Sequence, residues 1–381
     1  MRNGELDRRQ FLGVLGGALG AGVAVTVGVP LPAVARAAVG PRAYLGCYTS
    51  DGAGGRGIGV AVRDPRTGAL TVTSTIDVTD PSFLAPSPDG RFLYAVDEGS
   101  GPGSVTAVDL RQDPPKVLNT VAVQGNAPTH LCVTPDGRWA LTANYDSGSV
   151  SVLRIAADGS LGEVTDVARH NGSGPDPDRQ AGPHAHQVLV DPSGRWILAV
   201  DLGVDSVYVY RLADGKLIPH DQVRMAAGSG PRHLCFHPDD RRAYVANELD
   251  STITVCEWFA DDGILRPVQA VAADSNTGGS RNYPSEPVVS RDGRILYVAN
   301  RGHDNIATFG LFDNLLVPLA TTPCGGVFPR DLTLDPEGTR LYAANQKSNS
   351  VTRLDLDPMT GLPGAASPPL DFPAASCVLF G

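Results

Sequence analysis

Histidine, arginine and glutamate side chains recur at two places along this sequence. The first place precedes a short apolar segment and holds the pairs Ser82-Phe83, Thr129-His130, His186-Gln187, Arg232-His233, Ser285-Glu286 and Arg330-Asp331. The second place follows the Asn or Asp that ends a longer apolar segment and holds Glu98, Tyr145, Leu202, Glu248, Arg301 and Gln346. These positions vary between copies and include groups that transfer protons or bind anions, so they are the candidates for chemistry.

The recurrence comes from a repeated turn signature, which reads Pro-Asp-Gly in its fullest form. The second residue of the signature stands at positions 88, 135, 192, 238, 291 and 336, so successive copies are 47, 57, 46, 53 and 45 residues apart. Proline presets the first φ of such a turn, and Asp-Gly suits a tight hairpin. A period of this length indicates a repeat architecture.

Each repeat predicts four β-strands: a short apolar strand before the turn, a longer one after it, a β-branched third strand such as 149–153, and a more variable fourth. Residues 42–77 have the pattern of a further unit that lacks its first strand, and the lone apolar strand 376–380 supplies it. The sequence therefore predicts an all-β, seven-bladed β-propeller. Its four-stranded antiparallel blades are closed into a ring by the C-terminal strand, which pairs with the N-terminal blade.

The two variable places lie at the same end of a blade, because the first two strands are antiparallel. The first strand of a propeller blade lines the central channel, so these residues should surround one mouth of it. The predicted ring contains His130, His186, Arg232, His233, Glu248, Glu286, Arg301 and Arg330. Alternatively, each residue only caps a strand end or bonds a neighbouring blade. Capping is the interpretation we favour for Asn144, Asn247, Asn300 and Asn345, since Asn or Asp recurs there in every copy.

The 57-residue interval contains a Gly- and Pro-rich insertion, residues 170–186, that ends in His184-Ala185-His186. Its position predicts a loop over the channel mouth. Strand alternation puts the two histidines on one face, where they could bind a metal. No Asp, Glu or Cys at ligand spacing accompanies them, so we expect no metal and no other cofactor.

Composition limits the partners and the compartment. The formal net charge of −10 disfavours nucleic acid as a partner, and no segment of the body approaches the ~20 apolar residues of a membrane span. Residues 1–37 are interpreted as a twin-arginine signal peptide, with Arg8-Arg9 before a Gly-rich apolar run; a membrane anchor is the alternative. Residues 38–381 are then a propeller domain, expected to be a periplasmic or extracellular monomer. Its six scattered cysteines are expected to be free, buried thiols.

Several motifs together resemble the lactonase family of seven-bladed propellers. They are Tyr44-Leu45-Gly46-Cys47-Tyr48-Thr49, Gly182-Pro183-His184-Ala185-His186, Gly230-Pro231-Arg232-His233, Asn247-Glu248 and Asn300-Arg301-Gly302-His303, in this order. The family is typified by the propeller type of 6-phosphogluconolactonase and has a fungal relative, muconate-lactonizing enzyme. The resemblance implies an active-site group of His186, Arg232, Glu248 and Arg301. The sequence departs from the family at Asp331, where His is usual, and in its export signal, because the sugar-phosphate lactone is cytoplasmic.

The expected reaction is metal-independent hydrolysis of a sugar lactone or a related small-molecule lactone by an activated water. His186 or Glu248 would be the general base, and a Glu between two arginines has a depressed pKa, which favours His186. The residues expected to contact the rest of the substrate are His130, His184, His233, Glu286 and Arg330. A non-catalytic, exported surface or binding propeller is the main alternative and explains the export signal better. A calcium-dependent propeller lactonase is a third possibility.

Overall fold

The computed structural model describes residues 41–381 apart from residues 51, 100, 275–280 and 313–314. The twin-arginine interpretation falls on residues outside the described part. The described chain is built from β-strands, with one short 3-10 helix, η1 (Gln346–Ser348). No helix in the described ranges has the length and apolar character needed to cross a membrane.

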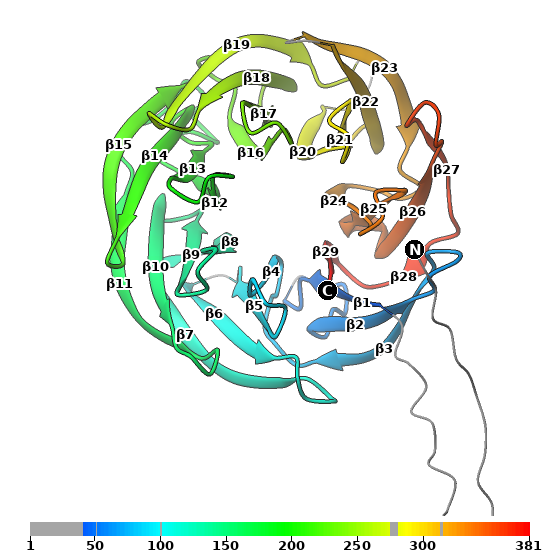
Figure 1. The fold of residues 1–381 in the computed structure, drawn as a ribbon, viewed down its shortest axis with the longest axis horizontal. Coiled ribbons are helices and arrows are strands. Elements are labelled where there is room, and N and C mark those ends of the chain that lie inside the picture. The colour runs from blue at the N-terminus through cyan, green and yellow to red at the C-terminus, as the bar shows by residue number, and fades with distance from the viewer. Residues whose placement is uncertain (1–40, 51, 100, 275–280, 313–314) are drawn as a thin grey trace, which may run out of the picture. The chain divides into compact units, whose positions relative to one another are not determined.

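Seven antiparallel sheets are arranged as blades around a common centre (Figure 1). Blade 1 contains β1 (Arg42–Cys47), β2 (Ile58–Arg63), β3 (Leu70–Ile76) and the C-terminal β29 (Ala375–Phe380). Blade 2 contains β4 (Leu84–Pro86), β5 (Phe92–Asp97), β6 (Pro102–Asp109) and β7 (Lys116–Asn126), and blade 3 contains β8 (Pro128–Val133), β9 (Trp139–Asn144), β10 (Ser149–Ile155) and β11 (Leu161–Arg169). Blade 4 contains β12 (Ala185–Val190), β13 (Ile197–Asp201), β14 (Ser206–Ala213) and β15 (Lys216–Arg224).

The remaining three blades have the same strand order. Blade 5 contains β16 (Pro231–Phe236), β17 (Arg242–Asn247), β18 (Thr252–Phe259) and β19 (Ile264–Ala272). Blade 6 contains β20 (Tyr283–Val289), β21 (Ile295–Arg301), β22 (Asn305–Phe312) and β23 (Leu315–Pro323). Blade 7 contains β24 (Pro329–Leu334), β25 (Arg340–Asn345), β26 (Ser350–Leu356), β27 (Pro363–Ala366) and the two-residue β28 (Leu370–Asp371), which also pairs with β26. The predicted seven-bladed fold is confirmed.

The ring closes where the sequence predicted. β29 pairs antiparallel with β1, with Tyr44 opposite Leu379 and Leu45 opposite Val378. Beside this seam, the buried guanidinium of Arg63 in blade 1 reaches across to Asp335 at 3.3 Å and Glu337 at 2.7 Å in blade 7. The closing strand thus joins the two ends of the described chain within one sheet, and an ion pair joins the blades on either side.

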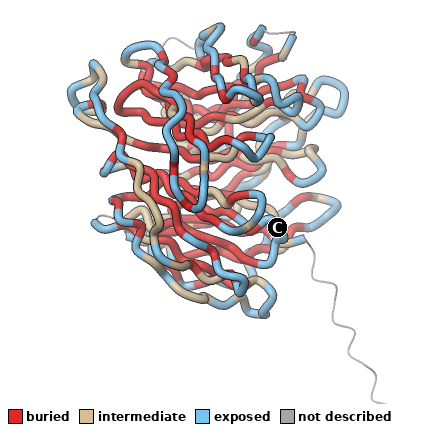
Figure 2. Tube along the Cα trace, turned by 60° about the vertical axis from the view of Figure 1, so that its left-hand side comes forward, coloured by how far each residue is buried: buried red, intermediate tan, exposed pale blue. Residues whose placement is uncertain are grey.

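Apolar side chains fill the spaces between neighbouring blades. One cluster joins Leu198 and Val209 of blade 4 to Val245 and Trp258 of blade 5, and the other clusters follow the same plan. The inner strands of each blade are largely buried, whereas the outermost strands, such as β15, β19 and β23, and the connecting loops are largely exposed (Figure 2). The turn signature serves this arrangement: in Ser87–Gly90 the Gly90 N–H donates to the Ser87 carbonyl, and Gly90 has a φ of +67° that favours glycine.

The innermost strand of most blades carries a β-bulge near its beginning. The register shifts at Thr129 in β8, His186 in β12, Arg232 in β16 and Arg330 in β24, and at Ser285 together with Glu286 in β20. A bulge leaves its residue outside the ladder and re-aims the side chain. The first variable place found in the sequence is therefore a recurring bulge beside the centre of the ring.

Candidate active site

The centre of the site is Glu248, whose carboxylate is bound by three arginines. Arg301 Nη2 lies 2.5 Å from Glu248 Oε2, and Arg232 Nε lies 3.4 Å from the same oxygen. Arg179 Nη2 donates to Glu248 Oε1 at 2.6 Å. Glu248, Arg232 and Arg301 are buried, so this cluster brings together three of the four residues implied by the family resemblance.

The backbone holds these side chains from three different elements. Glu248 follows β17, and its N–H donates to the Gly230 carbonyl at 2.7 Å, which ties it to the start of β16 where Arg232 sits. Arg301 ends β21, and its guanidinium also donates to the carbonyls of Tyr283 and Pro284. Antiparallel pairing places the end of β17 beside the start of β16, and the end of β21 beside the start of β20, so residues distant in sequence meet at one end of the blades.

Electrostatics set the protonation of this cluster. Burial alone raises the pKa of Glu248, but Arg301, Arg232 and Arg179 outweigh it and hold the pKa well below its ordinary value. Burial lowers the pKa of Arg232, and the charges of Arg301 and Arg330 lower it further. Glu248 is therefore a firmly ionised carboxylate, which makes it a poor general base, as the sequence analysis argued.

Three histidines from separate inner strands meet next to this cluster. The ring of His233 lies 5.1 Å from that of His186 and 5.3 Å from that of His130, both edge-on, and His130 also packs on Phe83 at 3.9 Å. All three are buried. Burial lowers the pKa of all three histidines well below the ordinary value. The charge of Arg232 lowers the pKa of His186 and His233 further. For His130, both His233 and Arg232 add to the effect of burial. All three imidazoles are neutral at pH 7.

His233 and Glu286 form a hydrogen-bonded pair rather than acting separately. His233 Nδ1 and Glu286 Oε2 are in short contact, and burial raises the pKa of Glu286 although the charge of Arg232 opposes this. Asp331, which stands where the family usually has His, is buried close by and accepts the Val378 N–H at 2.8 Å. Burial and the charge of Glu286 raise the pKa of Asp331 to about 7.

The insertion predicted to cover the channel mouth contributes Arg179, which was not among the residues predicted from the sequence. Besides Glu248, Arg179 Nη2 donates to the Tyr145 hydroxyl at 3.2 Å. His184 stacks on the Tyr145 ring at 4.4 Å, and His186 meets the same ring edge-on at 5.6 Å. Arg179 lies in no repeated position, so internal comparison offered no signal for it; its place in the insertion was the available clue.

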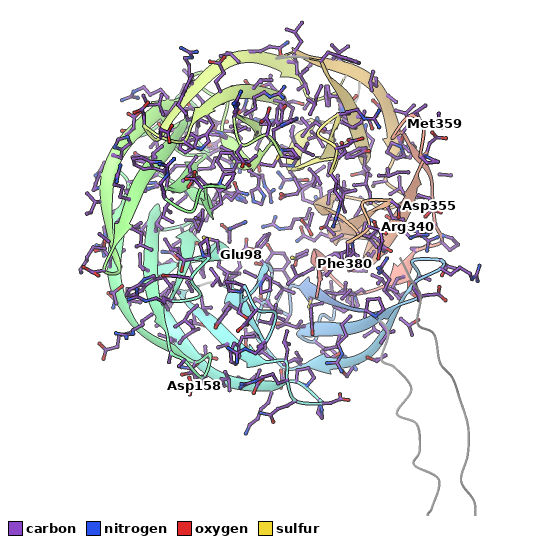
Figure 3. The ribbon with its side chains drawn as sticks, viewed as in Figure 1. Glu98, Asp158, Arg340, Asp355, Met359 and Phe380 are labelled. Atoms are coloured by element: carbon purple, nitrogen blue, oxygen red, sulfur yellow. The ribbon has the colours of Figure 1, made fainter. Side chains whose placement is uncertain are left out.

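The last predicted residue, Arg330, belongs to a second cluster. Its Nη2 donates to Glu98 Oε1 at 2.9 Å, and its guanidinium lies over the Tyr48 ring at 5.2 Å. The Tyr48 hydroxyl donates to the other oxygen of Glu98 at 2.7 Å. Glu98 is labelled beside the centre of the ring in Figure 3. It occupies the same repeat position in blade 2 that Glu248 occupies in blade 5.

Some members of the two variable places have structural roles. The hydroxyls of Thr129 and Ser285 each donate to a backbone carbonyl of the next blade, those of His186 and Pro329 respectively. Ser376 of the closing strand β29 donates to the Ser82 carbonyl in the same way. The recurring asparagines bond across the turn after the second strand, as Asn247 does to Thr252 and Thr254, both at 2.8 Å. The capping interpretation of these asparagines is confirmed. The bulge position thus links blades when it holds Ser or Thr and carries candidate chemistry when it holds His or Arg.

Neither disulfides nor a three-ligand metal cluster is found among the described residues. None of the six cysteines forms a disulfide, as predicted, but Cys132 and Cys235 are half-buried rather than fully buried. They lie in the inner strands β8 and β16.

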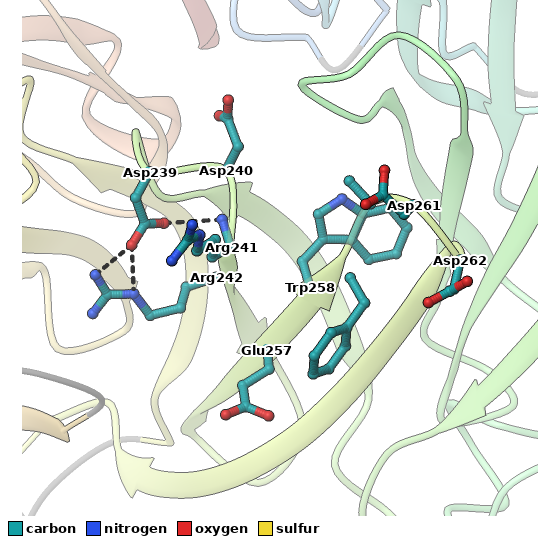
Figure 4. A pocket seen from close by; sticks show the side chains of 10 residues that line it. Asp239, Asp240, Arg241, Arg242, Glu257, Trp258, Asp261 and Asp262 are labelled. Atoms are coloured by element: carbon teal, nitrogen blue, oxygen red, sulfur yellow. Dashed lines mark hydrogen bonds and ion pairs between the residues drawn. The ribbon is translucent and has the colours of Figure 1, made fainter.

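A hollow on the surface of blade 5 lies away from these clusters. It measures about 840 Å³, is formed by the turn after β16 and the turn after β18, and contains the Asp239–Arg242 ion pair (Figure 4). These turns are at the opposite end of blade 5 from Arg232 and Glu248, because they join the far ends of the same strands. Glu257 and Asp261, which also line it, pair with Arg266 and Arg195 outside the lining. The hollow contains none of the residues from the two variable places, so it is not the candidate site.

The chain is similar to known proteins over nearly all of the described part. The family model described as "Lactonase, 7-bladed beta-propeller" matches residues 42–380. The 6-phosphogluconolactonase of Bacillus subtilis is 33% identical over 342 residues, which cover 88% of this chain and 97% of that protein. The solved periplasmic gluconolactonase PpgL of Pseudomonas aeruginosa has a TM-score of 0.83 at 30% identity, covering 89% and 98% of the two chains. The chain therefore belongs to the lactonase family of seven-bladed β-propellers.

Proposed function

We propose that this protein hydrolyses a sugar lactone or a related lactone that carries a negative charge, with His186 as the general base. The observation that carries the proposal is the neutral His186 ring next to the Glu248–arginine cluster. Two relatives, 33% and 32% identical to this chain, are named 6-phosphogluconolactonase, which supports lactone chemistry at this site.

The division of roles follows from protonation. Glu248 is held ionised by three arginines and has little tendency to accept a proton. Burial and Arg232 lower the pKa of His186 as well, but its ring is neutral and no charged partner among the described residues occupies its lone pair, which can therefore accept a proton from water. An anionic substrate that pairs with Arg232 would offset one of the charges that lower the pKa of His186, and the bound base would be stronger than the free one.

The arginines favour an anionic substrate. Four of them, Arg179, Arg232, Arg301 and Arg330, face the carboxylates of Glu248 and Glu98. The Nη1 of Arg232 is buried and has no hydrogen-bond partner among the described residues. Arginine binds carboxylate and phosphate well and stabilises a developing oxyanion, so Arg232 is suited to either role.

Turnover of δ-gluconolactone, its 6-phosphate and muconolactone, followed by acid release above the spontaneous rate, tests the proposal. His186→Ala should lower hydrolysis by at least about 100-fold while substrate binding, measured by calorimetry, survives. Full activity in that variant would overturn the assignment of His186. No turnover of any of the three lactones by the unaltered protein would favour the non-catalytic binding propeller. Loss of activity in chelator would favour a metal-dependent reaction.

We further propose that the protein is exported by the twin-arginine route. The Arg8-Arg9 pair and the Gly-rich run support this, and the relative PpgL is itself described as periplasmic. Replacing both arginines with lysine in the full chain should leave the folded propeller in the cytoplasm. Unchanged export of that variant would contradict the proposal.

A further inference from the structure

The proposed mechanism leaves one buried chain of side chains unused. It runs from His186 on β12 through His233 on β16 to Glu286 on β20, three neighbouring blades. The rings of His186 and His233 are 5.1 Å apart at an angle of 68°, and His233 Nδ1 is in short contact with Glu286 Oε2. The three groups therefore follow one another from the proposed base into the protein, with a hydrogen bond between His233 and Glu286 and a ring contact between His186 and His233.

Two ring nitrogens in this line have no assigned partner. His186 Nδ1 and His233 Nε2 are both buried without a hydrogen-bond partner among the described residues. A buried polar atom left unsatisfied is costly, and these two belong to adjacent rings. The structure has no hydrogen bond between these two nitrogens, so the relay requires the two rings to turn until His186 Nδ1 meets His233 Nε2. Such a bond would satisfy both atoms and leave His186 Nε2 for water and substrate.

We propose that His186, His233 and Glu286 form a proton relay, in which the proton that His186 takes from the attacking water is transferred through His233 and stored on Glu286. This inference rests on the proposed hydrolysis of a lactone. It gives His233 and Glu286 a positioning and proton-transfer role in place of the substrate contact that the sequence suggested for them.

The relay balances in the attack step. A water O–H bond breaks and its proton goes to His186 Nε2, while the water oxygen bonds to the lactone carbonyl carbon and the carbonyl π electrons move to oxygen. His186 Nδ1–H passes its proton to His233 Nε2, and His233 Nδ1–H passes its proton to the Glu286 carboxylate. Both imidazoles end neutral, and Glu286 ends as the neutral acid.

The same relay runs backwards when the ring opens. The tetrahedral oxyanion re-forms the carbonyl and the bond from carbon to the ring oxygen breaks. Glu286 returns its proton to His233 Nδ1, His233 Nε2–H passes one to His186, and His186 Nε2–H protonates the departing oxygen. The sum is one lactone and one water converted to one hydroxy acid, with the three side chains restored.

The local charges favour storage on Glu286 over storage on His186. An imidazolium at His186 would stand near Arg232, Arg330 and Arg301, which lower its pKa after burial. Burial raises the pKa of Glu286, so that carboxylate accepts a proton readily. The titratable or charged groups that face Glu286 are His233, Arg232 and Cys235 of β16, Asp331 of β24 and Cys377 of β29.

This charge pattern predicts the pH dependence. The relay accepts a proton only when Glu286 is ionised, so hydrolysis should rise with pH through the raised pKa of Glu286. Ionisation of Asp331 would produce a similar rise of the rate with pH, because burial raises the pKa of Asp331 to about 7. The matched variants are therefore Glu286→Gln and Asp331→Asn, each of which replaces one of these carboxyls with a neutral group of similar shape.

The first experiment measures kcat and KM of the purified propeller on δ-gluconolactone across pH 5 to 9, above the spontaneous rate. Glu286→Gln should lower kcat by about 100-fold with KM little changed, and its kcat should no longer rise with pH. In Asp331→Asn, kcat should still rise with pH, and Glu286→Asp should restore part of that rise. If Asp331→Asn loses this rise in kcat with pH while Glu286→Gln keeps it, the relay is overturned. No turnover of any of the three lactones by the unaltered protein would refute the proposed function, and the second experiment then tests the relay.

A second experiment needs neither a variant that folds nor a substrate. The unaltered protein is labelled with ¹⁵N-histidine and followed by NMR as the pH changes. Both His186 and His233 should stay neutral, and in each the proton should move from one ring nitrogen to the other. The two changes should share one pH midpoint, that of Glu286. Independent midpoints, or a charged imidazolium at neutral pH, would overturn the relay. A shared midpoint in a protein that hydrolyses none of the three lactones would support the relay and refute the proposed function, so the two failures are distinguishable.

Discussion

Replacing Glu248 with Gln is the most informative single perturbation of this site. The substitution keeps the shape of the side chain but removes the charge that neutralises three arginines. Arg232 and Arg301 are buried with Glu248, whereas about a third of the Arg179 side chain is exposed, so solvent screens that pair. Breaking a buried ion pair from one side typically costs about 3–5 kcal/mol, and this is the loss of unfolding free energy expected at pH 7.

The repeat supplies a matched control, because Glu98 occupies the same position in blade 2. Glu98 is bound by one arginine, Arg330, and by the Tyr48 hydroxyl. Glu98→Gln should therefore cost less, about 1.5–3 kcal/mol, which is the usual range for a hydrogen bond to a charged group. The unfolding free energies of the two variants and the unaltered protein are compared by urea unfolding, followed by far-UV circular dichroism. The comparison holds if the dependence of the free energy on urea concentration, m, is the same in all three.

The pH dependence fixes the sign of the effect. The pKa of Glu248 is depressed in the folded protein, so its contribution to stability is fully present above the unfolded pKa and is lost as the pH falls. With an unfolded pKa near 4.3, about 1.8 kcal/mol of the difference between the unaltered protein and Glu248→Gln should disappear between pH 7 and pH 3. A Glu248→Gln variant no less stable than Glu98→Gln, or a difference that does not narrow in acid, would refute this account.

Three further outcomes are expected. Arg179→Met should raise KM for a charged lactone more than it lowers kcat, as steady-state kinetics would show, because Arg179 binds Glu248 from the partly exposed insertion; an unchanged KM would contradict this. Arg63→Met should lower the unfolding free energy by about 3 kcal/mol in urea, since it leaves the fully buried Asp335 short of a partner; a neutral effect would contradict a role in closure. Thiol reagent should label the native protein slowly and all six cysteines after unfolding, because burial raises the pKa of Cys132 to about 12 and of Cys324 to about 11; rapid native labelling would contradict this.

Local patterns in the sequence determined the architecture of this protein. Turn residues and strand alternation act over a few positions, so the spacing of the turns from 88 to 336 was enough to predict the blades. The lone strand 376–380 predicted the closing partner of β1, because an unpaired sheet edge and an unpaired strand complete each other. The repeat frame also singled out Glu248, Arg301, His186 and Arg232 before any contact among them was known.

Only the tertiary structure decided which of these groups act on one another. Arg179 reaches Glu248 across 69 positions, and His233 meets Glu286 across 53. No local pattern encodes such distances, since they depend on how the blades close and on the bulges that turn His186 and Arg232 out of the ladder. The frame residues Thr129 and Ser285 looked equivalent to them in sequence, yet their short hydroxyl side chains reach the next blade and link it. At this shared backbone position, the length of the side chain decides whether a residue joins two blades or forms part of the site. The sequence specifies the side chain but does not place the backbone position in space.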